Sequence, residues 1–195
     1  MIKHIIFDMG NVLLRFDAEA TARGAVGDHP EISKIVEYTV FTPEWKLLDN
    51  GLISEEEALS RMVARAPQYQ KEITAMMSRW TQYLFPIEEM VPLIARLKEK
   101  GYSLHLLSNA SLRFFEYSPS IPAIGMMDTI NVSARMKLLK PQPEIYLRTL
   151  EEHHLPADEC LFIDDLAENI AGAEAVGIHG HRFVGAVELE RYLGS

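Results

Sequence analysis

The chain has 195 residues, of which 48% are hydrophobic and 24% are charged, a composition that indicates neither a disordered chain nor a disulfide scaffold. The net charge of −9 at pH 7 disfavours nucleic acid and acidic membranes as partners, because no basic run offsets it. A single cysteine, Cys160, excludes an intramolecular disulfide and a cysteine-based zinc site. The first residues lack the pattern of a signal peptide and no stretch is long enough to span a membrane, so we expect a cytoplasmic protein.

The predicted elements begin with a buried strand over residues 4–7, where the apolar run HIIF precedes Asp8. Residues 16–85 contain no convincing strand. Amphipathic patterns there predict helices around residues 30–48, 54–66 and 70–83. Ser54 and Glu57 have the spacing of a capping box at the start of the second of these helices. We therefore expect a helical insertion after the first strand.

Apolar runs and helical patterns alternate in the rest of the chain. Buried parallel strands are predicted at residues 103–107, 128–132 and 160–163, and a weaker run at residues 178–184 is expected at a sheet edge. Helices are predicted over residues 87–101, 143–154 and 167–177. This alternation favours right-handed crossovers and a doubly wound parallel α/β sheet. The predicted domains are a core of residues 1–15 and 86–195 and a helical unit of residues 16–85.

Polar side chains stand at the ends of the predicted strands. Asp8 ends the first strand, Ser108 the second, and Asp164 and Asp165 the fourth. The carboxyl ends of parallel strands share one edge of a sheet, and ligands bind there at the point where the strand order reverses. Lys140 precedes a helix that begins with proline after the third strand, and we expect it to reach the same edge.

These residue types suggest a particular chemistry. An aspartate can act as a nucleophile, a hydroxyl and a lysine can hold an anion, and an acidic pair can hold a cation. Mg²⁺ suits carboxylate ligands and commonly binds together with phosphate. Simpler interpretations stay open: Asp8 or the acidic pair can cap a turn or helix, Ser108 can cap a helix at residues 112–117, and Lys137 can bind the anion in place of Lys140.

Four segments, in order, resemble the motifs of the haloacid dehalogenase-like (HAD) hydrolase superfamily. They are FDMGNV at residues 7–12, LLSNA at 106–110, LLKPQPEIY at 138–146 and FIDDLAEN at 162–169. The resemblance covers nearly the whole chain and implies a Rossmann-type core with the insertion as a helical cap of the first cap class. The segment EWKLLDNGLISEEEA at residues 44–58 is similar to cap segments of the sugar-phosphate phosphatase branch.

The resemblance also implies roles for individual residues. Asp8 would be the nucleophile that becomes an aspartyl-phosphate, and Ser108 and Lys140 would bind the transferring phosphoryl group. Asn109, in the same motif as Ser108, is a further candidate for substrate binding.

A Mg²⁺ site is implied in the same way. Asp164 would be a direct ligand, together with Asp8 and the backbone carbonyl at Gly10. Asp165 would assist through water or a hydrogen bond. Asn169, which lies four residues after Asp165 and therefore on the same helix face, would support these metal-binding residues.

Gly10 departs from the pattern of most phosphatases in the superfamily, which have a second aspartate at this position. That side chain protonates the leaving oxygen and later activates water, a contribution of about 10²- to 10⁴-fold for general acid–base catalysis. We therefore expect a substrate with an acidic leaving group. The motif DMGNV resembles that of bacterial phosphatases acting on sugar 1-phosphates, which fits this expectation.

The leading hypothesis is thus a Mg²⁺-dependent phosphatase that acts on a small phosphorylated metabolite, with no nucleic acid or membrane partner and an undetermined oligomeric state. Arg15 and Trp45 are candidate substrate contacts, for which a surface ion pair and a packing role are the simpler interpretations. Two alternatives remain: a metal-independent haloacid dehalogenase in which Asp8 attacks carbon, and a phosphometabolite-binding protein that lost turnover at Gly10.

Overall fold

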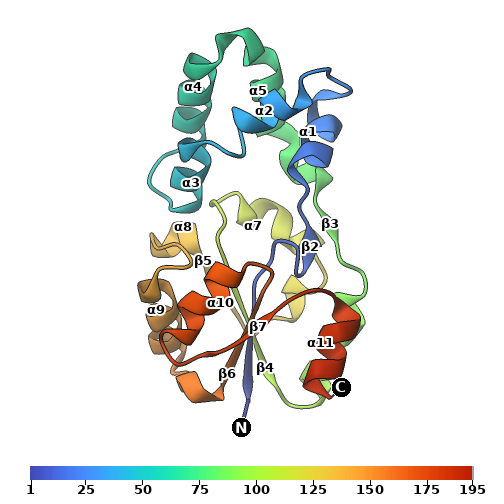
Figure 1. The fold of residues 1–195 in the computed structure, drawn as a ribbon, viewed down its shortest axis with the longest axis vertical. Helices are drawn as coiled ribbons and strands as arrows, with labels where there is room; N and C mark the ends of the chain where they lie inside the picture. The colour runs from blue at the N-terminus through green and yellow to red at the C-terminus, as the bar shows by residue number, and fades with distance from the viewer. Residues whose placement is uncertain (195) are drawn as a thin grey trace.

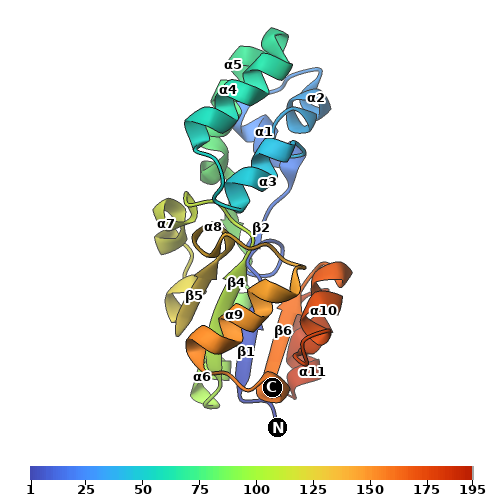
Figure 2. The same ribbon diagram turned by 90° about the vertical axis from the view of Figure 1, so that its left-hand side faces the viewer.

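Strand β1 (His4–Phe7) forms the centre of the fold in the computed structural model, which describes residues 1–194 (Figure 1). It pairs in parallel with β4 (Ser103–Ser108) on one side and with β6 (Cys160–Asp164) on the other. β5 (Thr129–Val132) and β7 (His179–Arg182) complete a five-stranded sheet in the order β5-β4-β1-β6-β7 (Figure 2). The order reverses at β1, so the crevice at its carboxyl end is the expected ligand site.

This architecture confirms the predicted doubly wound α/β sheet. Each apolar run of the sequence lies in a strand, and β7 is an edge strand paired only with β6, as its weaker pattern predicts. The central strands β1, β4 and β6 are mainly apolar because both of their faces are covered by helices.

Alternate residues of β1 face opposite sides of the sheet. Ile5 and Phe7 pack toward α6 (Met90–Glu99) and α11 (Ala186–Leu193). Ile6 packs on the other face against α9 (Pro143–His153) and α10 (Ala167–Glu174). All three side chains are fully buried, and each such burial stabilises the fold by about 1.5–3 kcal/mol. Their packing fixes the register of β1 and thereby the position of Asp8 at its end.

A separate lobe of helices lies above the carboxyl end of the sheet (Figure 1). It contains α1 (Ala18–Val26), α2 (Ile32–Glu37), α3 (Pro43–Asp49), α4 (Glu55–Arg65) and α5 (Gln70–Arg79), with 3₁₀ turns at Pro67–Tyr69 and Trp80–Tyr83. Ser54 caps α4 by accepting the Glu57 N–H at 3.1 Å. The Glu57 side chain pairs with Arg61 instead of completing the predicted capping box.

The chain enters and leaves the helical lobe through a two-stranded antiparallel ribbon. Its strands are β2 (Leu14–Arg15) and β3 (Phe85–Pro86), and neither was predicted. We keep the predicted division into residues 1–15 and 86–195 and residues 16–85 as a proposal.

The remaining elements are short and lie between the strands of the sheet. They are α7 (Phe114–Tyr117), α8 (Ser133–Met136) and 3₁₀ turns at Ser118–Ser120, Ile124–Met126 and Ala157–Glu159. Within residues 1–194, none of the helices combines the length and the apolar character needed to cross a lipid bilayer.

Candidate active site

Asp8 lies at the carboxyl end of β1, where its backbone N–H donates to the Ile163 carbonyl at 2.8 Å. Its side chain is mostly buried, and the chain turns sharply just after it. The Met9 carbonyl accepts the Leu13 N–H at 2.8 Å, and Asn11 adopts a left-handed conformation with φ of 55°. Asparagine tolerates this conformation better than most residues, which allows the chain to fold back beside Asp8.

Lys140 connects two carboxylates of the site. Its Nζ lies 2.6 Å from Asp8 Oδ1 and 2.6 Å from Asp164 Oδ2, and all three residues are buried. Lys137, the alternative lysine, is exposed at the end of α8 and does not line the cavity beside Asp8. The geometry therefore favours Lys140 as the site's lysine.

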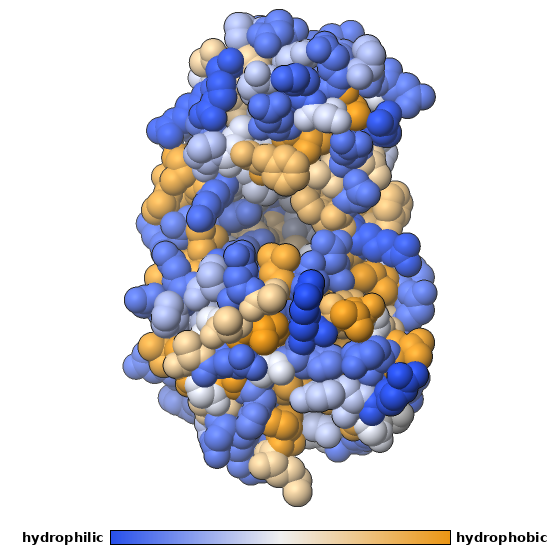
Figure 3. Space-filling model, viewed as in Figure 1, coloured by the Kyte–Doolittle hydropathy of each residue, from blue (hydrophilic) through white to orange (hydrophobic). Residues whose placement is uncertain are grey.

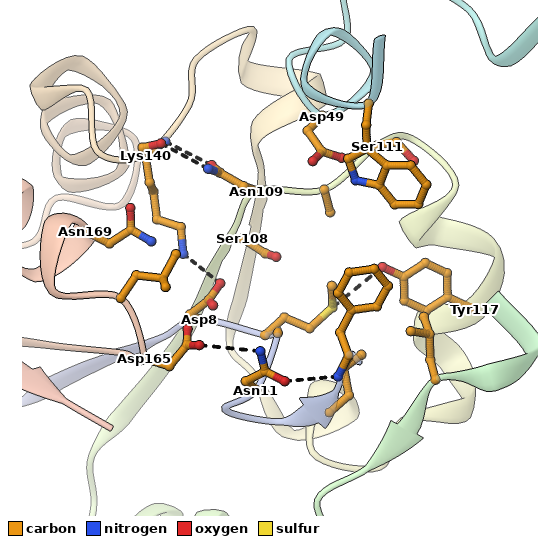
Figure 4. A pocket seen from close by; sticks show the side chains of 18 of the residues that line it. Asp8, Asn11, Asp49, Ser108, Asn109, Ser111, Tyr117, Lys140, Asp165 and Asn169 are labelled. Atoms are coloured by element: carbon orange, nitrogen blue, oxygen red, sulfur yellow. Dashed lines mark hydrogen bonds and ion pairs between the residues drawn. The ribbon is translucent and has the colours of Figure 1, made fainter. Parts of the chain in front are cut away.

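Asn109 holds the backbone of Lys140 in place (Figure 4). Its Oδ1 accepts the Lys140 N–H at 2.9 Å, and its Nδ2 donates to the Lys140 carbonyl at 3.0 Å. This reciprocal pair fixes the segment from which the lysine side chain extends. Asn109 therefore acts first as a positioning residue, although it also lines the cavity.

Three carboxylates converge beside Lys140. Asp8, Asp164 and Asp165 each offer an oxygen, and these oxygens lie within 4.8 Å of one another. Asp164 accepts hydrogen bonds from the Leu166 N–H at 2.9 Å and from Asn169 Nδ2 at 3.0 and 2.9 Å. Oxygen donors at this spacing suit a hard divalent cation such as Mg²⁺.

Burial dominates the electrostatics of this group. It raises the pKa of Asp8 to about 6, against the opposing effect of Lys140, and the neighbouring charge of Asp164 raises it further. Burial also raises the pKa of Asp165, with Asp164 adding to the effect. Burial alone would lower the pKa of Lys140, but Asp8 and Asp164 hold it above its ordinary value. The site thus carries excess negative charge that one lysine does not balance.

A cavity of about 240 Å³ lies between the helical lobe and the sheet (Figure 3). Asp8, Ser108 and Lys140 line it from the sheet side. Four aromatic side chains also line it, those of Phe16, Trp45, Trp80 and Tyr117. The rings contact one another in a row, with centroids 5.1 Å apart for Trp45 and Trp80 and 5.7 Å apart for Trp80 and Tyr117.

The structure separates the predicted residues into two groups. All of the predicted site residues except Arg15 lie in or directly beside this cavity: Asp8, Gly10, Trp45, Ser108, Asn109, Lys140, Asp164, Asp165 and Asn169. Ser108 is buried at the end of β4 and does not cap α7, whose N-cap is Arg113.

Arg15 is the exception, because it lines a different hollow beside Val187 and Glu89. Leu14 of the same strand β2 faces the active-site cavity, and successive residues of a strand point to opposite sides. The expected substrate contact of Arg15 is therefore not supported by its position.

A family model for the haloacid dehalogenase-like hydrolases matches residues 2–177. The chain belongs to this family. Sesquiterpene phosphatase astK of Aspergillus oryzae is 27% identical over 184 residues, covering 91% of this chain and 88% of that protein. D-ribitol-5-phosphate phosphatase of Bacteroides thetaiotaomicron is 24% identical over 192 residues, covering 91% and 89% of the two chains.

Solved structures show the same fold. A HAD-family enzyme of Bacteroides thetaiotaomicron, crystallised with magnesium and inorganic phosphate, superposes with a TM-score of 0.73 at 22% identity. The superposition covers 93% of this chain and 94% of that one. The likeness confirms the fold of this HAD-like hydrolase.

Sequence reasoning missed one acidic residue of the site in this HAD-like hydrolase. Asp49, the last residue of α3, lines the cavity from the helical lobe, across from Asp8 (Figure 4). Burial raises its pKa to about 7, and the Ser111 N–H offsets this only in part. The rule that places polar residues at strand ends cannot find a residue on a helix of the lobe. The available signal was its position in the segment that resembles HAD caps.

Proposed function

We propose that this HAD-like hydrolase is a Mg²⁺-dependent phosphatase that hydrolyses a small phosphorylated metabolite through an aspartyl-phosphate. The observation that carries the proposal is the buried contact of Asp8 with Lys140, beside the carboxylates of Asp164 and Asp165. Phosphatases among the relatives and the phosphate-bound structural neighbour support the same reaction class.

The reaction uses the side chains of the sheet edge. Asp8 attacks the phosphorus, and the bond from phosphorus to the leaving oxygen breaks on the opposite side. The Lys140 ammonium and the Ser108 hydroxyl stabilise the charge of the transferring phosphoryl group. Water then attacks the aspartyl-phosphate, which releases inorganic phosphate and regenerates the Asp8 carboxylate.

The carboxylates fit a divalent cation. Asp8, Asp164 and Asp165 would hold Mg²⁺, and the Gly10 backbone carbonyl is a further candidate ligand. One lysine among three carboxylates leaves a net negative charge, which would repel a phosphate dianion without a cation. When bound, Mg²⁺ neutralises phosphoryl charge and orients the oxygens. Asp165 is half-buried and faces the cavity, where a ligand can reach it.

Asp164→Asn should weaken Mg²⁺ binding by about tenfold or more, because a neutral amide replaces a charged hard ligand. Titration calorimetry with MgCl₂ alone measures this without any substrate. Asp158→Asn is the matched control, since Asp158 is exposed and does not line the cavity. An affinity equal to that of wild type would place the ion elsewhere.

The helical lobe would act as a cap of the first class, because it is inserted after the first motif, and its Trp45 and Trp80 line the cavity above the sheet edge. We propose a sugar phosphate as the substrate. A leaving oxygen of low basicity, such as an anomeric one, is favoured by Gly10 unless another group donates the proton, and the aromatic side chains pack well on the apolar face of a sugar ring.

A second candidate is a phosphate ester with an apolar body, such as a prenyl phosphate. The row of rings from Phe16 to Tyr117 favours it, because these rings offer apolar contact to the body of such an ester. The sesquiterpene phosphatase among the relatives supports this class.

A panel of sugar phosphates, aryl phosphates and prenyl phosphates assayed with Mg²⁺ tests the proposal. We expect phosphate release that a chelator abolishes, with one class clearly preferred. Halide release from 2-haloacids that is insensitive to the chelator would instead identify a dehalogenase. Phosphate-ester binding without turnover would identify a binding protein.

A further inference from the structure

We propose that Asp49 is the general acid and base of this enzyme and replaces the side chain that Gly10 lacks. This inference rests on the proposed phosphatase function. It concerns a carboxyl group on the helical lobe, whereas the nucleophile and the phosphate-binding residues belong to the sheet edge.

The position of Asp49 suits proton transfer to the leaving group. Displacement at phosphorus is in line, so the leaving oxygen lies on the side of the phosphorus away from Asp8. Asp49 lies on the wall of the cavity across from Asp8 (Figure 4). Next to Asp8, by contrast, Gly10 offers no proton donor, and a Cβ atom built on it would meet nothing within 4 Å.

Asp49 has no cation to stabilise its charge. Within residues 1–194, its carboxylate forms no ion pair, and its stabilising contact is the Ser111 N–H. Trp45, Trp80 and Tyr117 line the same part of the cavity. An unpaired carboxylate in such surroundings costs stability and favours its protonated form. A carboxyl group that titrates near neutral pH is suited to both donating and accepting a proton.

Contacts with the sheet side hold Asp49 in the cavity. Ser133 Oγ, at the start of α8, donates to the Asp49 backbone carbonyl at 2.5 Å. Two residues later, Gly51 adopts a left-handed conformation and lies so close to Ala134 that a Cβ would be 2.1 Å from its carbonyl oxygen. The end of α3 is thus docked on the same body that carries Asp8.

The proposed steps balance as follows. As Asp8 Oδ bonds to phosphorus and the phosphorus–oxygen bond of the ester breaks, the Asp49 carboxyl gives its proton to the leaving oxygen, which departs as an alcohol. In the second half, the Asp49 carboxylate takes a proton from the attacking water. The new phosphorus–oxygen bond then displaces Asp8, and Asp49 is again protonated.

The other charged groups near Asp49 are engaged with partners of their own. Glu55 at the start of α4 is paired with Arg113 at 3.1 Å. From α8, Arg135 lies over the Phe115 ring at 3.6 Å. Burial holds the pKa of Tyr117 above its ordinary value. On the sheet side Lys140 is engaged by two carboxylates, so Asp49 is the available proton donor on the wall of the lobe.

The Asp49→Asn variant tests this role with two substrates that differ in the basicity of their leaving oxygen. With an alkyl phosphate, whose leaving oxygen needs a proton, kcat/KM should fall about 10²- to 10⁴-fold. With p-nitrophenyl phosphate, which needs none, we expect a loss below about tenfold, and kcat/KM reports this first irreversible step. The slowed second half-reaction should produce a burst of up to one equivalent of nitrophenol. Asp28→Asn, at an exposed residue of the lobe, is the matched control and should leave both substrates unaffected.

Three further measurements separate a catalytic role from a structural one. The kcat/KM of wild type for the alkyl phosphate should fall above about pH 7, where Asp49 ionises, and the variant should lack this decline. Introducing Gly10→Asp into the Asp49→Asn protein should recover part of the lost activity, because it places an acid beside Asp8. In a Tyr117→Phe variant, the dependence of kcat/KM on the pKa of the leaving group should be no steeper than in wild type.

Equal losses on both substrates, or no loss on either, would overturn the role of Asp49 while leaving the phosphatase proposal intact. If wild type releases phosphate from no ester in the presence of Mg²⁺, the phosphatase proposal fails and the role of Asp49 fails with it.

Discussion

Replacing Asp8 with asparagine is expected to lower kcat at least about a thousandfold, because the amide nearly matches the carboxylate in shape but cannot attack phosphorus. Asp8 is the carboxylate at the end of the central strand, in contact with Lys140 at 2.6 Å. The measurement is phosphate release at saturating substrate with Mg²⁺. A chemical trap for acyl-phosphates should detect the intermediate in wild type and not in the variant.

The fold should survive this change. Burial raises the pKa of Asp8 to about 6, so its ionised form is costly at neutral pH and the neutral amide removes that cost. An unchanged or higher melting temperature would show that lost turnover is chemical in origin. Residual activity above about a tenth of wild type would contradict covalent catalysis, since a missing nucleophile costs far more than one tenfold step.

Lys140→Met should have the largest effect on stability, a loss of about 3–5 kcal/mol in the absence of Mg²⁺. The lysine is buried and lies 2.6 Å from both Asp8 and Asp164, so its removal leaves two buried carboxylates without a cation. Urea unfolding measures the loss. Activity should disappear as well, because the phosphoryl group loses its positive partner.

Lys137→Met is the matched control, because Lys137 is exposed on the same segment and should change stability little. Mg²⁺ should stabilise the Lys140→Met protein more than wild type, since the ion and the lysine neutralise the same carboxylates. A loss no larger than that of the control would contradict the buried ion pairs.

Several features of this enzyme could be predicted because they follow from local sequence. The central strands β1, β4 and β6 are mainly apolar runs, and the residue at which each run stops fixes a polar group at the sheet edge. Asp8, Ser108 and Asp164 are therefore placed by chain order alone. Asn169 follows from helical spacing, and it donates to both Asp164 oxygens.

Other features depend on contacts that local patterns do not contain. Helix α1 (Ala18–Val26) was not predicted, and Gly24, a poor helix former, lies inside it. The side that Arg15 faces could not be predicted, because β2 has two residues and the side each faces is set by pairing with β3. Asp49 reaches the cavity only because the lobe docks on α8, a tertiary contact between distant segments.

The hydrogen bond from Ser133 to the Asp49 carbonyl has a consequence for the size of substrates. An ester whose body exceeds the cavity of about 240 Å³ can still place its phosphoryl group between Ser108 and Lys140, but it would keep the end of α3 off Ser133. If Asp49 is the proton donor, such an ester would bind, but its leaving oxygen would receive no proton. Phosphorylated proteins and other esters too bulky for the closed cavity would then be rejected in kcat rather than in KM, so that this single contact would select substrates by size.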